Sequence, residues 1–265
     1  MSNQSSNILL SVKNLTIGYG TKVIQKNINF DVKQGSIFAL MGGSGCGKST
    51  LLKSMIGLLE PIAGDYLVKN ENYWKVSRKH RIKIAHNFGI LFQNAALWSS
   101  MTVGENVALP LQLFTNLSPE MIHRLVELKL GLVGMEYAIN LYPSELSGGM
   151  RKRCGLARAL ALDPEILFFD EPSAGLDPIT SKRLDDLILT LRNGLGTTII
   201  IVSHELSSLF TIADDGIFLD AESKTPLAHG SPQEMHDHPS CQLVYDFMHR
   251  QRYENAEEKE NKDDH

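Results

Sequence analysis

The sequence predicts an α/β fold with an inserted helical segment, and three observations support this prediction. Short, continuously apolar runs are typical of parallel strands buried on both faces, and four of them occur here: SIFALMG, FGILFQ, EILFFD and TTIIIVSH. About the first thirty residues alternate apolar and polar side chains, which favours antiparallel strands with one buried face. From Asn94 to about Leu162 the pattern becomes helical, and no internal repeat is present.

The expected elements follow one another along the chain. LLSVKNLTIGYG and KVIQKNINFDV are the antiparallel strands, and SIFALMG leads into a glycine-rich loop and a helix that carries Leu51, Leu52, Met55 and Ile56. TVGENVALPLQL, PEMIHRLVELKLGLVGM and GGMRKRCGLARALAL make up the helical segment. DPITSKRLDDLILTLRNGLG has helical periodicity with a glycine stop, and IFLDAESKTPLAHG has the pattern of a late hairpin.

These elements predict a single domain over residues 1–265. We expect an α/β core at 7–93 and 160–232, a helical subdomain at 94–159, and a C-terminal helix with an acidic tail at 233–265. The tail sequence ENAEEKENKDDH is expected to be disordered, because it has almost no apolar side chains to bury.

Composition limits the classes of protein to which this chain can belong. A hydrophobic content of 43% in 265 residues is enough to bury one substantial core or two small lobes. A net charge of −4 and the absence of a basic stripe argue against a nucleic-acid partner. Cys46, Cys154 and Cys241 have no paired spacing and suggest free thiols in a reducing compartment. We find neither a signal peptide nor the roughly 18 apolar residues of a spanning helix, so membrane association is expected only through a partner.

The segment GGSGCGKST matches the phosphate-binding pattern G-x-x-x-x-G-K-[ST] between a predicted strand and a predicted helix. Its glycines allow successive backbone N–H groups to point at phosphate oxygens, and the following helix adds the positive end of its dipole. Lys48 is expected to contact the β- and γ-phosphates and Ser49 to bind Mg²⁺, so ATP and Mg²⁺ are the expected ligands. The nucleotide-binding candidates are Gly42, Gly43, Ser44, Gly45, Cys46, Gly47, Lys48, Ser49 and Thr50.

Two acidic residues and a histidine follow buried strands. EILFFDE places Asp170 at the carboxyl end of a core strand, beside the phosphate loop in a fold of this type. Asp170 is expected to hold Mg²⁺, mostly through water, and Glu171 to polarise the attacking water as general base. His204 ends the next strand and would reach the γ-phosphate, although a lone histidine there can also be an ordinary core residue.

A second glycine-rich turn, SELSGGM, opens the last predicted helix of the helical segment. Ser147 stands at the N-cap, and Gly148 and Gly149 begin a helix whose first N–H groups are unpaired, which makes a second anion site. The helical segment separates this turn from Lys48, so one chain cannot readily fold both onto one triphosphate. We therefore expect a symmetric head-to-tail pair, in which the Ser147 turn of one copy closes over the nucleotide held by Lys48 of the other.

Tyr19, GGSGCGKST, Gln93, LSGGM, ILFFDE, SAGLD and His204 occur in this order, and with them residues 7–235 resemble the nucleotide-binding subunit of an ABC transporter. The resemblance implies a P-loop NTPase (RecA-like) core with an N-terminal antiparallel β subdomain and an inserted α-helical subdomain. It also implies that Tyr19 stacks on adenine, that Gln93 senses the γ-phosphate and Mg²⁺, and that Asp177 lies across the dimer interface. The alternatives are an ordinary strand aromatic for Tyr19 and a helix cap before Pro178 for Asp177.

One position departs from the family pattern, because Met150 replaces the usual glutamine of the signature. LFQNAALWSSMTVGENVALPL, PSELSGGMRKR and DEPSAGLDPIT resemble the ATPases of Mla-type systems, which carry phospholipids between the inner and outer membranes and maintain outer-membrane lipid asymmetry. The resemblance implies a homodimer at the cytoplasmic face of the bacterial inner membrane, with a membrane permease dimer, a periplasmic MCE-domain protein and a cytoplasmic STAS-domain subunit. An ABC ATPase for another lipophilic or organic-solvent substrate, and a soluble non-transport ABC ATPase, are the alternatives.

Several further residues have two possible interpretations. Trp98, Met101, Val103 and Leu109 could form a groove for a short permease helix or pack the core of the helical segment itself. Arg151, Lys152 and Arg153 are expected to form a solvated helix face, with contacts to the acidic tail or to phosphate as the alternative. Cys46 and Cys154 are expected to act as small space-filling residues.

Overall fold

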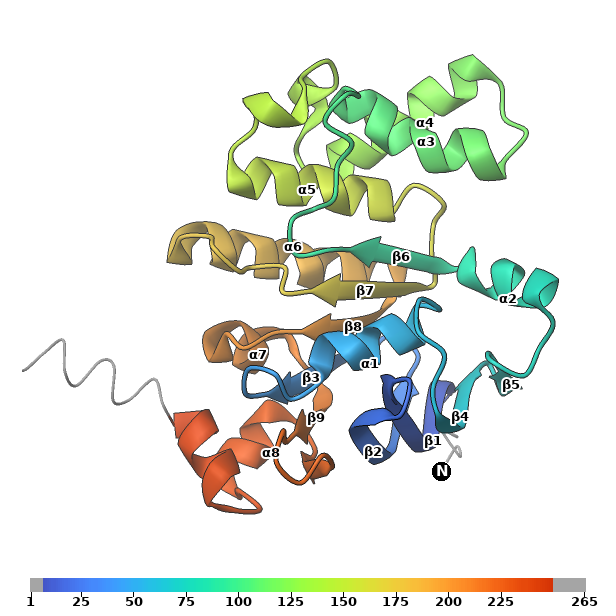
Figure 1. Cartoon of the computed structure of the whole chain (residues 1–265). Coiled ribbons are helices and arrows are strands. Elements are labelled where there is room, and N and C mark those ends of the chain that lie inside the picture. The colour runs from blue at the N-terminus through green and yellow to red at the C-terminus, as the bar shows by residue number, and fades with distance from the viewer. Residues whose placement is uncertain (1–6, 250–265) are drawn as a thin grey trace, which may run out of the picture.

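Two β-sheets and the helices packed on them make up residues 7–249, the part of the chain that the computed structural model describes (Figure 1). The larger sheet has six strands in the order β10-β9-β3-β8-β7-β6. The strands are β3 (Ile37–Gly42), β6 (Phe88–Leu91), β7 (Ile166–Asp170), β8 (Thr198–Val202), β9 (Asp215–Leu219) and β10 (Pro226–His229). All pairs are parallel except β9 and β10, which form the predicted late hairpin.

The smaller sheet is antiparallel, with strands in the order β2-β1-β4-β5. Its strands are β1 (Ile8–Tyr19), β2 (Lys22–Lys33), β4 (Ala63–Val68) and β5 (Glu71–Asn72). In β2, the side chains of Ile28, Phe30 and Val32 are buried while those between them are exposed, as the alternating sequence pattern predicts. The predicted antiparallel pair near the N-terminus is therefore confirmed.

The helices begin and end where the sequence supplies capping residues. Thr102 and Glu105 form a capping box at the start of α3, Asp177 caps α6, and Gly196 ends α6 in the left-handed conformation. The helices are α1 (Lys48–Met55), α2 (Arg78–Ala85), α3 (Val103–Phe114), α4 (Pro119–Leu132), α5 (Gly148–Ala159), α6 (Pro178–Leu195), α7 (Leu206–Ile212) and α8 (Pro232–Asp237). Short 3-10 turns span Glu136–Ala138 and Pro143–Glu145.

The helical segment α3–α5 lies between β6 and β7 in the sequence and above these two strands in Figure 1. The larger sheet separates two hydrophobic cores, because successive side chains of its strands point to opposite faces. In β8, Ile199 and Ile201 join the core that contains α3–α7, whereas Ile200 and Val202 join the core beneath the antiparallel sheet and α1. The predicted α/β fold with a helical insertion is confirmed.

The structure decides between the two interpretations for one residue of the possible permease groove, Val103. Val103 is wholly buried. Its backbone N–H donates to the carbonyl of Leu141, and this bond holds the first turn of α3 against the chain near Leu141. Val103 therefore packs the segment's own core and cannot belong to an open groove. Trp98 is 60% exposed, while Met101 and Leu109 are half-buried.

The chain continues past α8 into a helical stretch at residues 242–249. Phe247 of this stretch packs edge-on against Phe218 of β9, with ring centroids 5.0 Å apart, so the stretch is fixed to the core. The acidic sequence ENAEEKENKDDH lies outside the described residues. Between residues 7 and 249, no helix has both the length and the apolar character that crossing a membrane requires.

Candidate nucleotide-binding and catalytic site

Four neighbouring parallel strands end at one edge of the larger sheet, and the predicted site residues follow these ends. The phosphate loop follows β3, Asp170 ends β7, His204 comes two residues after β8, and Gln93 comes two residues after β6. A cleft of about 520 Å³ opens there. It is lined by Ile24, Gly42, Gly43, Ser44, Gly45, Gly47, Lys48, Ser49, Thr50, Gln93, Glu171 and His204. Ligands of open α/β sheets bind at this edge.

The loop backbone has the conformation that its glycines allow. Gly45 and Gly47 have φ values of 77° and 103°, in the region that L side chains rarely adopt. At Gly42 an added Cβ would lie 2.2 Å from the Leu219 carbonyl oxygen, so this position also requires glycine for space. The loop ends at the N-terminus of α1, where unpaired N–H groups face an incoming anion.

A buried glutamine that the sequence analysis missed fastens this loop. Gln25 Nε2 donates to the carbonyl oxygens of Cys46, at 2.7 Å, and of Asp220, at 2.5 Å. The side chain is fully buried, so it ties the antiparallel sheet to the phosphate loop and to the end of β9. The sequence does not predict this contact, because a single glutamine in an alternating strand can lie on the exposed face of the sheet as well as on the buried one.

The Lys48 ammonium lies over the loop. Nζ donates to the carbonyl oxygens of Gly42, at 2.8 Å, and Gly43, at 2.9 Å, and the side chain is almost fully buried. A buried cation held beside a ring of backbone N–H groups is complementary to phosphate oxygens.

Ser49 and Asp170 place a hydroxyl and a carboxylate side by side, with Ser49 Oγ 3.3 Å from Asp170 Oδ1. Burial raises the pKa of Asp170, and the Ser49 hydrogen bond and the charges of Lys53 and Lys48 partly oppose this effect. A carboxylate that loses hydration in this way is stabilised by a cation, and oxygen ligands are those that Mg²⁺ prefers. The donor set therefore fits Mg²⁺ bound together with a triphosphate.

Glu171 and His204 are in direct contact at the mouth of the cleft. His204 Nδ1 lies 2.8 Å from Glu171 Oε2, which joins the ends of β7 and β8. The backbone of Glu171 has φ 50°, an uncommon conformation for a residue with a Cβ. β7 and β8 are neighbours in the sheet, and this pairing brings Glu171 and His204 together.

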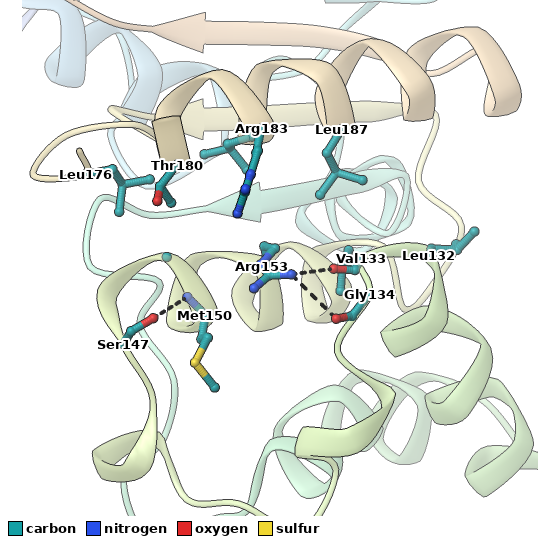
Figure 2. Close-up of a pocket in the computed structure, with 12 residues that line it drawn as sticks. Leu132, Val133, Gly134, Ser147, Met150, Arg153, Leu176, Thr180, Arg183 and Leu187 are labelled. Atoms are coloured by element: carbon teal, nitrogen blue, oxygen red, sulfur yellow. Dashed lines mark hydrogen bonds between the residues drawn. The ribbon is translucent and has the colours of Figure 1, made fainter. Parts of the chain in front are cut away.

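Other sequence-predicted residues lie outside this cleft: Tyr19, Ser147, Gly148, Gly149 and Asp177. Ser147 is exposed and accepts a hydrogen bond from Met150 N, as an N-cap does, and it lines a separate cavity of about 340 Å³ between α5 and α6 (Figure 2). Asp177 caps α6 by accepting from the N–H groups of Ile179 and Thr180. Tyr19 is 49% exposed at the end of β1 and does not line the cleft. Within one chain, therefore, the second glycine turn does not reach the first.

The predicted solvated face of α5 is wrong at Lys152. Its side chain is only 6% exposed, and Nζ donates to the carbonyl oxygens of Ala174, at 2.6 Å, and Glu171, at 3.3 Å. Arg153 points instead toward the end of α4, donating to the carbonyls of Val133 and Gly134 (Figure 2). Helical periodicity alone could not predict the burial of Lys152, because this burial depends on the turn after β7, whose backbone carbonyls pack against this face of α5.

Alkylation of Cys46 is expected to obstruct ATP binding, because the thiol belongs to the phosphate loop. Cys46 is 1% exposed, and burial raises the pKa of its thiol, so the reaction will be slow. Mass spectrometry should report the modified fraction, and equilibrium titration with a fluorescent ATP analogue should report binding.

The exposed thiol of Cys241 reacts first, so Cys241→Ser provides the background for this test and the unmodified protein its control. Undiminished ATP binding after complete modification of Cys46 would contradict the prediction.

Comparisons with known proteins agree with this geometry. Residues 25–174 match the family described as ABC transporter. The chain is 41% identical over 227 residues to the intermembrane phospholipid transport system ATP-binding protein MlaF of Haemophilus influenzae, covering 86% of this chain and 85% of that protein. MlaF of Escherichia coli is 41% identical over 236 residues, which cover 89% and 87%. The probable ribonucleotide transport ATP-binding protein mkl of Mycobacterium leprae is 41% identical over 208 residues, which cover 78% and 60%.

Two solved structures are similar over most of their length. A cbiO1 protein from Clostridium perfringens, described as part of the cbiONQ ABC transporter complex, has a TM-score of 0.80 at 30% identity, covering 88% of this chain and 92% of that one. A dimeric ATP-binding cassette in a post-hydrolysis state, bound to ADP and Pi, has a TM-score of 0.76 at 28% identity, with coverage of 84% and 98%.

Proposed function

Because this chain belongs to the ABC transporter family, whose ATP-binding subunits hydrolyse ATP, we propose that it powers phospholipid transport between the inner and outer membranes. The names of its MlaF relatives support this cargo, and the shared identity extends over most of both chains. The mycobacterial relative carries a name with a different cargo, so another transported substrate is the alternative to be tested.

One observation carries the assignment of the site. Lys48, Ser49, Gln93, Glu171 and His204, which follow four neighbouring parallel strands, line a single cleft. A phosphate loop alone is compatible with many nucleotide-dependent proteins. Its combination with a strand-end carboxylate and a histidine from the next strand matches the requirements of ATP hydrolysis.

Each residue has a proposed role in that reaction. Lys48 neutralises phosphate charge, and Gly42–Thr50 bind the phosphates through backbone N–H groups and the Ser49 hydroxyl. Ser49, Gln93 and Asp170 would hold Mg²⁺, which supplies charge neutralisation on the phosphates when bound. Glu171 accepts a proton from the attacking water. His204, which is hydrogen-bonded to Glu171, orients the Glu171 carboxylate beside the γ-phosphate.

We place two copies of this chain around the nucleotides. ABC cassettes dimerise, and one similar structure is a dimer bound to ADP and Pi. Ser147, Gly148 and Gly149 are exposed or half-buried and lie away from the cleft of their own chain, which leaves them available to a second copy. In this arrangement Asp177 lies at the interface, and Tyr19 stacks on adenine at the edge of the β1–β2 hairpin.

The proposed setting is the cytoplasmic face of a bacterial inner membrane, and the support for it is the similarity to MlaF proteins, which are named as ATP-binding proteins of an intermembrane phospholipid transport system. A dimeric membrane permease would hold the ATPase pair, with a periplasmic MCE-domain protein and a cytoplasmic STAS-domain subunit completing the transporter. The exposed Trp98 and the neighbouring apolar side chains Ile82 and Phe114 line a groove of about 540 Å³ that suits a short permease helix.

Gentle detergent purification of the native complex tests the proposal. The expected result is co-purification of a permease, an MCE-domain protein and a STAS-domain subunit with bound phospholipid, and an ATPase rate that changes when these subunits are removed. Recovery with no membrane protein would overturn the transporter assignment. Recovery of a permease with a different bound cargo would overturn the phospholipid assignment alone.

A further inference from the structure

Lys152 is a buried cation that the proposed reaction does not use. It belongs to α5, the helix that the Ser147 turn opens, and only 6% of it is exposed. Burial lowers the pKa of its ammonium, whereas the nearby carboxylates of Glu205 and Glu171 raise it. Burying an ammonium costs free energy unless hydrogen bonds replace its hydration. Here two backbone carbonyls do so, those of Glu171 and Ala174.

The two carbonyls belong to the turn that sets the conformation of Glu171. Glu171 N donates to the Val202 carbonyl at 2.9 Å, and Ala174 N donates back to the Glu171 carbonyl at 3.2 Å. Between these bonds Glu171 has φ 50°, a conformation that persists in a residue with a Cβ only when its surroundings fix it. The Lys152 ammonium donates hydrogen bonds to the carbonyls of the first and fourth residues of this turn, Glu171 and Ala174, and so links its two ends.

The same helix presents other residues to a different surface. Ser147, Met150 and Arg153, spaced three residues apart, line the cavity between α5 and α6 (Figure 2). Lys152 lies on another face of α5 and contacts the turn after β7. Lys152 is five positions after Ser147, which corresponds to a rise of about 7.5 Å along the helix axis. Because a helix of this length moves as a unit, a displacement of the Ser147 turn also displaces the Lys152 ammonium.

We propose that Lys152 is a positioning residue that transmits closure of the Ser147 turn on the partner's nucleotide to Glu171 of its own copy. The proposal rests on the dimer described under Proposed function, in which Ser147 contacts the nucleotide of the other copy. When the Ser147 turn of one copy closes on the nucleotide held by its partner, the Glu171 carboxylate of that same copy is fixed beside the nucleotide that this copy holds itself. The two ATP molecules of the pair are coupled through α5, and no contact between the two carboxylates is needed.

Substitution of Lys152 in the full-length chain tests this coupling. Lys152→Met keeps the apolar stem and removes the donors, and we expect kcat to fall about 10- to 100-fold, because small displacements of a reacting group have effects of this size. ATP affinity and ATP-dependent dimerisation should stay within about twofold of the wild type. Lys152→Arg, which can donate to both carbonyls, should restore most of the lost turnover.

Arg153→Met is the matched control, because it removes the adjacent cation of α5 while its hydrogen bonds stay within the helical segment. Phosphate release, calorimetric binding of ATP and size-exclusion chromatography provide the three measurements. Normal turnover of Lys152→Met would overturn the proposal, as would a parallel loss of ATP binding, or an arginine variant no better than methionine. Wild-type protein that hydrolyses ATP as a monomer would instead overturn the underlying dimer.

Discussion

Glu171→Gln is expected to retain ATP binding and to lose turnover by about 10²- to 10⁴-fold, the range that a general base contributes. The amide cannot accept the proton of the attacking water, but it keeps the size of the carboxylate and a carbonyl oxygen that can accept a hydrogen bond from His204. The phosphate loop is unchanged by this substitution, since Lys48 and the glycine backbone supply the contacts with phosphate. Closed, ATP-loaded dimer should therefore accumulate.

Steady-state phosphate release measures the turnover, and size-exclusion chromatography with and without ATP measures the dimer. Glu165→Gln is the control, because Glu165 directly precedes β7 at its opposite end and forms an ion pair with Lys69 at the surface. Ordinary hydrolysis by Glu171→Gln would exclude its role as general base.

Ser147→Arg is expected to abolish ATP-driven dimer closure and most of the hydrolysis while leaving nucleotide binding to the single chain nearly normal. Ser147 is exposed and lines a different cavity from Lys48, so a large side chain there leaves the chain's own cleft open. In a symmetric pair the same side chain would enter the position of the partner's phosphates. Hydrolysis that depends on closure should fall by at least about 100-fold, as expected when reacting groups are misplaced.

Ser147→Ala is the control that separates the effect of losing the helix cap from the effect of blocking dimer closure with a large side chain. It removes the hydrogen bond from Met150 N and costs about 1 kcal/mol of helix stability without adding bulk. If Ser147→Arg abolished ATP binding by the isolated chain, as measured by calorimetry at concentrations where it is monomeric, the assignment of this turn to the partner's nucleotide would be wrong.

Local patterns were sufficient to predict most of the fold. The parallel strands are continuous apolar runs, α6 starts at a capping aspartate and ends at a glycine, and the phosphate loop is defined by its own glycines. The meeting of Asp170, Glu171 and His204 near Ser49 was also predictable, because neighbouring parallel strands deliver their carboxyl ends to one edge. The roles of these residues remain predictions.

Contacts between segments that are distant in the sequence could not be predicted. Lys152 is buried because the turn after β7 covers one face of α5, and Val103 is buried because the segment near Leu141 covers the start of α3. Gln25 bonds across almost two hundred residues to Asp220. In each case the residue type is compatible with an exposed position, and only the tertiary packing decides the outcome.

The left-handed backbone at Glu171 has an evolutionary consequence. A residue with a Cβ costs about 1 kcal/mol or more in this conformation, a cost that glycine avoids and asparagine reduces. Duplicated genes that keep nucleotide binding but no longer need hydrolysis would gain stability by replacing this glutamate. Among paralogues of this architecture, glycine or asparagine at the position of Glu171 should therefore mark copies that have drifted into inactive pseudoenzymes.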